Sequence, residues 1–159
     1  MGDSFLKEEA TFNASAAYNE LELFFSCARD IERFGNVYNL PSIWYFISDS
    51  KAHRRLALEL HSNKILTNIN VSVEHSAKEN WSGPTSSHVG KEAFQTAAME
   101  WWMFGLCDFF VYTKFSGFGR TAAMRSMSEK SHFSVPRDTP CYQQNHETIE
   151  DMSNTWSFI

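Results

Sequence analysis

The sequence predicts an α/β fold, a Rossmann-like three-layer half-domain with a small parallel sheet. Apolar segments of strand length alternate along the chain with amphipathic segments of helical length. The strand-like segments are apolar at successive positions, which is typical of strands covered on both faces. An alternating order of this kind favours parallel strands joined by right-handed helical crossovers.

The N-terminal half of the chain begins with an expected amphipathic helix over residues 16–34, whose apolar positions recur at helical spacing. A polar connector follows, and an apolar strand is expected over residues 43–48. Either Asp49 or Ser50 can cap the next helix, because both side chains accept hydrogen bonds from free N–H groups at a helix start. A short strand over residues 65–69 completes this half.

The C-terminal half opens with residues 70–90, a polar, serine-containing segment that is longer than most connections in compact domains. A helix over residues 91–106 is predicted to turn Phe94 and Trp102 toward neighbouring elements. It leads into an apolar strand over residues 109–113. These three strands are expected to form one parallel sheet.

A glycine-rich stretch follows the last expected strand and reads Ser116-Gly117-Phe118-Gly119-Arg120. The alanine-rich segment after it has the composition of a helix, so the glycines are expected at a strand-to-helix turn. The first N–H groups of a helix have no partners inside the helix, and the helix dipole adds partial positive charge there. The stretch therefore predicts an anion site.

The chain length is consistent with one domain, expected over residues 1–128. After this point the hydrophobic periodicity ends, and prolines and scattered polar residues take over. Residues 129–159 are therefore expected to form an irregular C-terminal tail.

Composition narrows the classes of function. The formal charge of −5 lacks the basic stripe of a nucleic-acid binder, so no nucleic-acid partner is expected. The sequence contains no apolar run long enough to span a bilayer, and its first residues do not form a secretory signal. The histidines show no metal-ligand spacing and there is no D-x-D pair, so neither a metal nor another cofactor is expected.

The three cysteines, Cys27, Cys107 and Cys141, form no C-x-x-C pair. Buried free thiols are expected in preference to a disulfide. Three sequons for N-glycosylation begin at Asn13, Asn70 and Asn80. They suit a lumenal history, although a chain rich in Asn and Ser contains one or two by chance.

Polar side chains at the expected strand ends are the candidate site residues. Ligands of open parallel sheets collect beyond the carboxyl ends of the strands. There, Asp49 and Ser50 follow one strand, and Asp49 offers a carboxylate to ring N–H groups or ribose hydroxyls. Ser116, Gly117 and Arg120 follow another strand and could hold a diphosphate.

A purely structural interpretation of the same residues stays open. Asp49 then only caps a helix, and Ser116 with Gly117 only forms a tight turn. Arg120 then pairs with a carboxylate such as Asp108 instead of a ligand. No residue of the chain is assigned a catalytic role.

A family resemblance extends over roughly residues 24–126. The segments that carry it read Trp44-Tyr-Phe-Ile-Ser-Asp49-Ser, Lys64-Ile-Leu-Thr, Ala97-Ala-Met-Glu-Trp-Trp-Met-Phe-Gly-Leu-Cys-Asp108-Phe-Phe-Val-Tyr-Thr113 and Ser116. They resemble the carboxyl-terminal half of fucosyltransferase-like enzymes, the α1,6- and protein O-fucosyltransferases. The resemblance implies the donor half of a GT-B glycosyltransferase, which binds GDP-fucose without a metal.

The chain departs from the family pattern at three places. Ser50 stands where the family has a second acid, and Gly117 stands where the α1,6 enzymes have a polar side chain. The family's arginine strand, approximately His-x-Arg-x-Gly-Asp, is expected before the first helix, and the sequence begins just past that point. The chain is thus expected to be incomplete or inactive alone, as a fragment or a pseudoenzyme.

Two hypotheses follow for the function. The chain is either the GDP-sugar-binding domain of a metal-independent glycosyltransferase or a non-catalytic structural subunit of a larger assembly that reuses the fold. The second hypothesis expects a protein partner over the open sheet edge, where strand N–H and C=O groups would otherwise be unpaired. The compartment follows the choice: the Golgi or endoplasmic reticulum lumen for the enzyme, the cell interior for the subunit.

Overall fold

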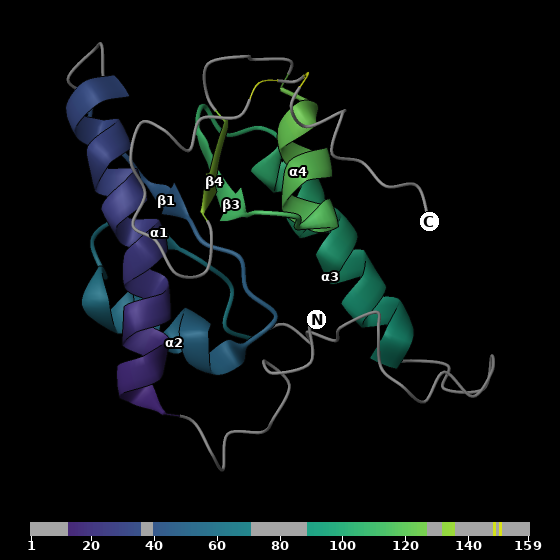
Figure 1. Ribbon diagram of the computed structural model, residues 1–159. Helices are drawn as coiled ribbons and strands as arrows, with labels where there is room; N and C mark the ends of the chain where they lie inside the picture. The colour runs from purple at the N-terminus through teal and green to yellow at the C-terminus, as the bar shows by residue number, and fades with distance from the viewer. Residues whose placement is uncertain are drawn as a thin grey trace. The chain divides into compact units, whose positions relative to one another are not determined.

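The computed structural model describes residues 13–35, 40–70, 89–126 and 132–135, together with residues 148 and 150. The described residues form a mixed α/β structure with four helices and two pairs of parallel strands (Figure 1). The predicted α/β class with parallel strands is therefore confirmed. The chain divides into two compact units. Unit 1 comprises Met1–Tyr18 and Ile43–Glu100, and unit 2 comprises Asn19–Ser42 and Trp101–Ile159.

The first helix, α1, spans Ala14–Gly35 and has Asn13 at its N-terminal end. Oδ1 of Asn13 accepts hydrogen bonds from the N–H groups of Ser15 and Ala16, each at 3.1 Å. These bonds occupy two of the N–H groups that have no partner inside the helix. The helix therefore starts two residues before the predicted position, because a side-chain cap extends it.

Strands β1 (Trp44–Tyr45) and β2 (Ile65–Leu66) belong to unit 1 and pair in parallel, with Trp44 opposite Ile65. The helix α2 (Lys51–Leu60) makes the crossover between them. Parallel strands need a connection of this kind, since a short turn cannot return the chain to the same end of the sheet. Both strands are shorter than the segments that the sequence predicts.

Unit 2 contains the strand β3 (Phe110–Thr113) and the strand β4 (His132–Val135), which also pair in parallel. The helix α4 (Gly117–Met124) lies between them in sequence. The single parallel sheet that we expected of residues 43–48, 65–69 and 109–113 is therefore wrong for the described residues. The first two segments pair with each other, and the third pairs with β4.

The strand β4 falls within residues 129–159, for which the sequence predicts only an irregular tail. Its four residues alternate polar and apolar side chains and are too few for a recognisable period. Pairing with β3 buries them instead: His132 is fully buried, and Val135 is 1% exposed. The hydrogen bonds of the ladder and the burial against β3 therefore stabilise a strand that local preference does not indicate.

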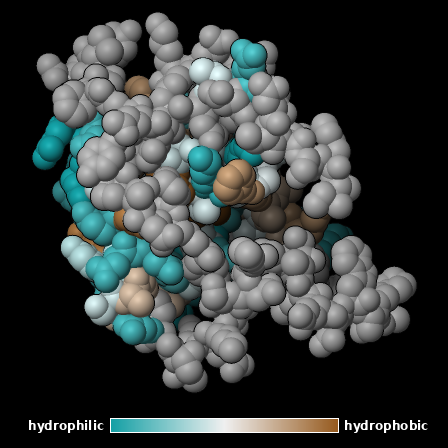
Figure 2. Space-filling view, in the orientation of Figure 1, coloured by the Kyte–Doolittle hydropathy of each residue, from teal (hydrophilic) through white to brown (hydrophobic). Residues whose placement is uncertain are grey.

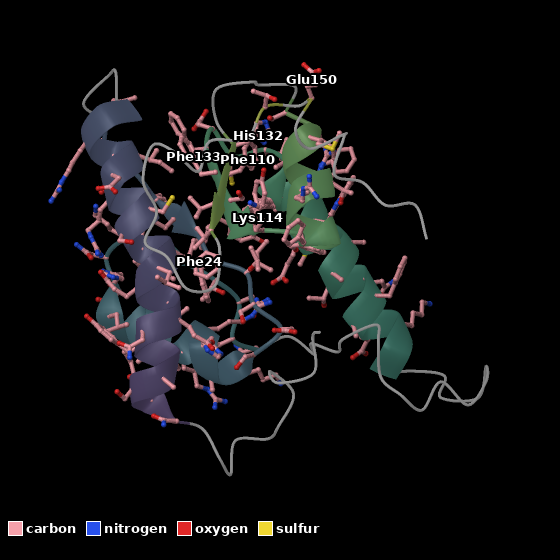
Figure 3. The ribbon with its side chains drawn as sticks, viewed as in Figure 1. Phe24, Phe110, Lys114, His132, Phe133 and Glu150 are labelled. Carbon is pink, nitrogen blue, oxygen red and sulfur yellow. The ribbon has the colours of Figure 1, made fainter. Side chains whose placement is uncertain are left out.

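The core of unit 2 lies where the strands β3 and β4 meet the helix α1. Cys27 and Val135 are its buried centre, and the partly buried side chains packed against them are Leu23, Phe24, Ile31, Val111 and Phe133. The rings of Phe110 and His132, opposite each other in the β3–β4 ladder, stack with centroids 5.1 Å apart (Figure 3). The tail segment is therefore an integral part of this core.

The helix α3 (Val89–Phe104) buries a different face from the predicted one. Ala93, Glu100 and Phe104 are buried, whereas Phe94 is 74% exposed and Trp102 is 57% exposed. Figure 2 shows apolar side chains beside hydrophilic ones on the drawn face of the molecule. The prediction that these side chains turn toward neighbouring elements is wrong for Phe94. The ring of Trp102 is partly exposed, but its centroid lies 3.7 Å from the guanidinium carbon of Arg125.

Cys27 corrects the expectation about the thiols. It is fully buried and disulfide-bonded, whereas Cys107 is a free, half-buried thiol. Cys141 lies outside the described residues. Sequence spacing alone does not reveal a pairing of cysteines that are distant along the chain.

Candidate functional site

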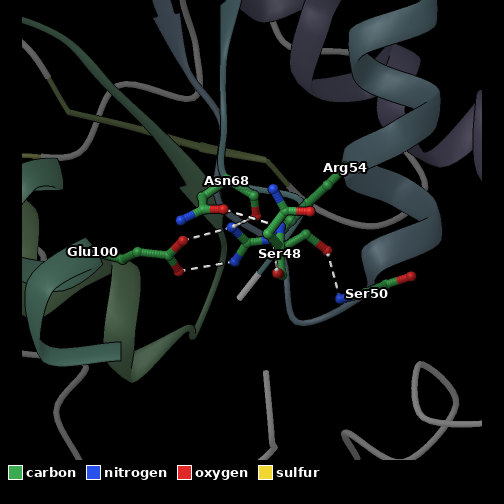
Figure 4. Close-up of polar contacts among 6 residues, drawn as sticks. Ser48, Ser50, Arg54, Asn68 and Glu100 are labelled. Carbon is green, nitrogen blue, oxygen red and sulfur yellow. Dashed lines mark hydrogen bonds and ion pairs between the residues drawn. The ribbon is translucent and has the colours of Figure 1, made fainter. Parts of the chain in front are cut away.

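The carboxyl ends of β1 and β2 are held by the side chain of Arg54, which lies on α2 and is fully buried. Its Nε donates to the main-chain oxygen of Ser48 at 2.6 Å, in the segment that follows β1. Its Nη1 donates to the main-chain oxygen of Asn68 at 3.0 Å, shortly after β2. One guanidinium therefore ties together the two chain segments that leave the parallel strands (Figure 4).

The charge of Arg54 is balanced by Glu100, which α3 supplies within the same unit. Nη1 and Nη2 of Arg54 lie 2.5 Å and 2.8 Å from Oε1 and Oε2 of Glu100, so the pair is bidentate (Figure 4). The two side chains are only 1% and 5% exposed. A buried pair with this geometry and with further hydrogen bonds to main-chain oxygens offsets the cost of removing both charges from water.

The segment Ser48-Asp49-Ser50 is fixed at both of its ends. Oγ of Ser48 accepts a hydrogen bond from the N–H of Ser50 at 3.1 Å. Oγ of Ser50 in turn accepts from the N–H of His53 at 3.3 Å and caps α2. Ser50, and not Asp49, is therefore the capping residue of the two that the sequence allows.

Asp49 keeps its carboxylate available. It is half-buried, and within the described part of the chain its side chain forms no hydrogen bond or ion pair. The structural interpretation of Asp49 as a helix cap is thus wrong. Asp49 lies between two held serines in the segment that leaves β1, and ligands of open parallel sheets collect beyond the carboxyl ends of the strands.

The second group of candidate residues surrounds the start of α4 in unit 2. Ser116 caps this helix, because its Oγ accepts from the N–H of Gly119 at 3.1 Å. The sequence predicts both glycines in the turn before this helix. The helix instead begins at Gly117, so both glycines lie in its first turn. The turn itself contains Phe115, whose φ of 71° is in the left-handed region. Such a conformation is uncommon for a large side chain.

The two glycines of α4 differ in their surroundings. A Cβ on Gly119 would lie 2.7 Å from Cβ of Tyr112, so this glycine lets the helix pack against β3. A Cβ on Gly117 would meet nothing within 4 Å. The open space at the helix start is therefore next to Gly117 alone, beside the N–H groups that a bound anion would use.

We expect Gly119→Ala to lower the free energy of unfolding by about 1 to 3 kcal/mol, since the new methyl group overlaps a buried side chain. Gly117→Ala is the matched control, and it should leave stability unchanged or raise it by up to about 1 kcal/mol through helix propensity. Denaturant titration of both variants measures the difference. Equal effects of the two substitutions would contradict this account of the glycines.

Arg120 lies on α4 and is 4% exposed. Asp108 forms no ion pair within the described residues, so the considered pairing of Arg120 with Asp108 is absent there. Asp108 is exposed. The role of Arg120 as a contact of the anion site stays a prediction from the sequence.

The candidate residues fall into two groups. Asp49 and Ser50 are in unit 1, whereas Ser116, Gly117 and Arg120 come together in unit 2. The prediction missed Arg54 and Glu100, which hold the first group in place. The only sequence signal for Arg54 is its position three residues before Ala57 on the buried face of α2.

Cys107 is a free thiol in the described residues, and its surroundings disfavour the reactive thiolate form. Burial raises the pKa of the Cys107 thiol, and the nearby charge of Asp108 raises this pKa further. The thiol is therefore protonated at neutral pH, and a thiol reacts poorly as a nucleophile in that form. Within the described residues, no group of three or more His, Cys, Asp or Glu side chains could hold a metal ion.

None of the helices in the described residues is both long enough and apolar enough to cross a membrane.

Comparison of the chain with protein-family models, with curated proteins and with solved structures found no match.

Proposed function

We propose that the chain is a donor-binding domain for a nucleoside diphosphate sugar of the GDP-fucose type, in a glycosyltransferase that needs no metal. The observation that carries the proposal is the start of α4. There, a strand leads directly into a capped helix whose first residue, Gly117, faces open space. The helix dipole and the unbonded N–H groups favour a diphosphate at this end.

Ser116 can serve as cap and ligand contact at the same time. Its oxygen accepts the N–H of Gly119, and its O–H hydrogen remains to be donated to a phosphate oxygen. In a transferase without a metal, such donors would stabilise the negative charge that develops on the leaving diphosphate. The identity of the sugar and base is an expectation from the resemblance to fucosyltransferase-like enzymes.

Asp49, in unit 1, is proposed by itself as a contact to ring N–H groups or ribose hydroxyls, and this contact is treated independently of the anion site in unit 2. Its support is the half-buried carboxylate without a partner in the described residues. Arg54 and Glu100 act on this contact only indirectly, because they hold the main chain on either side of it.

The test is calorimetric titration of the chain with GDP and with GDP-fucose. The double variant Ser116→Ala with Gly117→Val should bind about tenfold to a hundredfold more weakly. The hydroxyl donor is lost, and a branched side chain covers the helix start. Ser62→Ala, at an exposed serine outside the candidate residues, is the control and should bind as the unmodified chain does.

Ser116→Asp separates ligand binding from helix capping. Aspartate caps a helix as well as serine does, so the structure should be kept. Its negative charge would repel a diphosphate, so affinity should fall further than in Ser116→Ala. Asp49→Asn tests the contact proposed for unit 1 by itself.

If the folded chain does not bind guanine nucleotides even at millimolar concentration, the donor-binding proposal is wrong. The hypothesis of a non-catalytic subunit then takes its place.

A further inference from the structure

A sequon for N-glycosylation lies at the start of α1 and reads Asn13-Ala14-Ser15. All three residues are described and all three are exposed. N-glycosylation attaches an oligosaccharide to the asparagine of such a motif, and it requires a surface position in a protein of the secretory route.

The hydrogen bonds of Asn13 are compatible with a glycan. The contacts with the N–H groups of Ser15 and Ala16 both use Oδ1. The main-chain oxygen of Asn13 accepts the N–H of Ala17 at 2.9 Å. A glycan would replace a hydrogen on Nδ2, so the cap of α1 would remain intact.

The second, independent observation is the disulfide of Cys27. This cysteine is fully buried in the core of unit 2, so its bond is made as the chain folds and not on a finished surface. Structural disulfides form in oxidising compartments, and thiols in the cytosol are kept reduced. Oxidation and N-glycosylation occur together in the lumen of the secretory pathway.

We propose that the chain matures in an oxidising, glycosylating compartment and carries an N-linked glycan on Asn13. This inference is independent of nucleotide binding. In the reaction, Nδ2 of Asn13 attacks the first sugar carbon of a lipid diphosphate-linked oligosaccharide. The new bond joins nitrogen to carbon, the bond from that carbon to the diphosphate oxygen breaks, and Nδ2 loses one proton. The lipid diphosphate is the leaving group.

The deciding experiment uses the protein isolated from its own cells, with free thiols blocked during lysis. Peptide N-glycosidase in water labelled with heavy oxygen converts a glycosylated asparagine to labelled aspartate. Mass spectrometry should find this label at Asn13 and should find Cys27 in a disulfide-linked peptide. An unmodified Asn13 would contradict the proposed glycosylation. A blocked free thiol at Cys27 would contradict maturation in an oxidising compartment.

Variants expressed in the same cells separate the glycan from the helix cap. Asn13→Asp and Ser15→Ala should each remove one glycosidase-sensitive step in electrophoretic mobility, and both keep a capping acceptor at position 13. Ser15→Thr preserves the sequon and should keep the step. Asn19→Asp changes an exposed asparagine of the same helix that is outside any sequon, and it should also keep the step. Loss of the step in Asn19→Asp, or its retention in Asn13→Asp, contradicts the proposal.

Discussion

Arg54→Met should lower the free energy of unfolding by about 3 to 5 kcal/mol. The substitution leaves the carboxylate of Glu100 buried without its partner, at 4% exposure. It also removes the donors to the main-chain oxygens of Ser48 and Asn68. The loss therefore combines an uncompensated buried charge with two unsatisfied acceptors at the strand ends.

The matched control is Arg55→Met, on the same helix at an exposed position. A surface arginine contributes about 1 kcal/mol or less, whatever charges lie near it. Denaturant titration of both variants should therefore give clearly different midpoints. Similar midpoints would mean that the pair of Arg54 and Glu100 does not carry the stability assigned to it.

A double substitution separates the charge from the packing. Arg54→Met with Glu100→Leu removes both charges and replaces them with apolar side chains, so it should be more stable than Arg54→Met alone. When Glu100→Leu is also measured alone, the non-additive part of the three changes in unfolding free energy gives the coupling free energy of the pair. Arg54→Lys keeps the charge but not the bidentate fork. Its free energy of unfolding should therefore lie between those of Arg54→Met and the unmodified protein.

Reduction of the disulfide at Cys27 should lower the free energy of unfolding by about 2 to 4 kcal/mol. The bond restricts the unfolded chain, and its sulfur lies among apolar side chains in the core of unit 2. The measurement compares denaturant midpoints of the protein with and without a reductant. Peptide mapping without reduction identifies the cysteine that is joined to Cys27.

Cys107→Ser is the control for this measurement, because Cys107 is a free thiol. The variant should respond to the reductant as the unmodified protein does. Cys27→Ala should abolish the response and should be at least as unstable as the reduced protein, since it also leaves a cavity. A reductant response that persists in Cys27→Ala would contradict the assignment of the disulfide.

Several elements could be predicted from the sequence because their causes are local. The helices α1 and α2 follow from apolar positions at helical spacing, and a serine stands directly before both α2 and α4. Capping involves atoms only three residues apart, so a cap at Asp49 or Ser50 could be predicted without information about distant parts of the chain, and the structure selects Ser50. The capping role of Ser116 is equally local, but it was not predicted.

Pairing of the strands was decided by the tertiary structure. The apolar segment of β3 predicts a buried strand, but it does not specify β4 as the neighbour that hydrogen-bonds to it. The four residues of β4 are too few to show a recognisable period, and they become a strand because β3 supplies hydrogen-bonding partners and the core supplies burial. Strand partners are long-range choices, and local composition constrains them weakly.

The residues around the candidate site show the same division. Asp49 and Ser116 stand out in the sequence because they follow apolar segments, and in the structure each lies a short segment beyond the end of a parallel strand. Arg54 and Glu100 are 46 residues apart, so the residues around each of them in the sequence do not predict their contact. A buried charge is stable only beside a matching charge and further hydrogen bonds, and only folding brings those groups together.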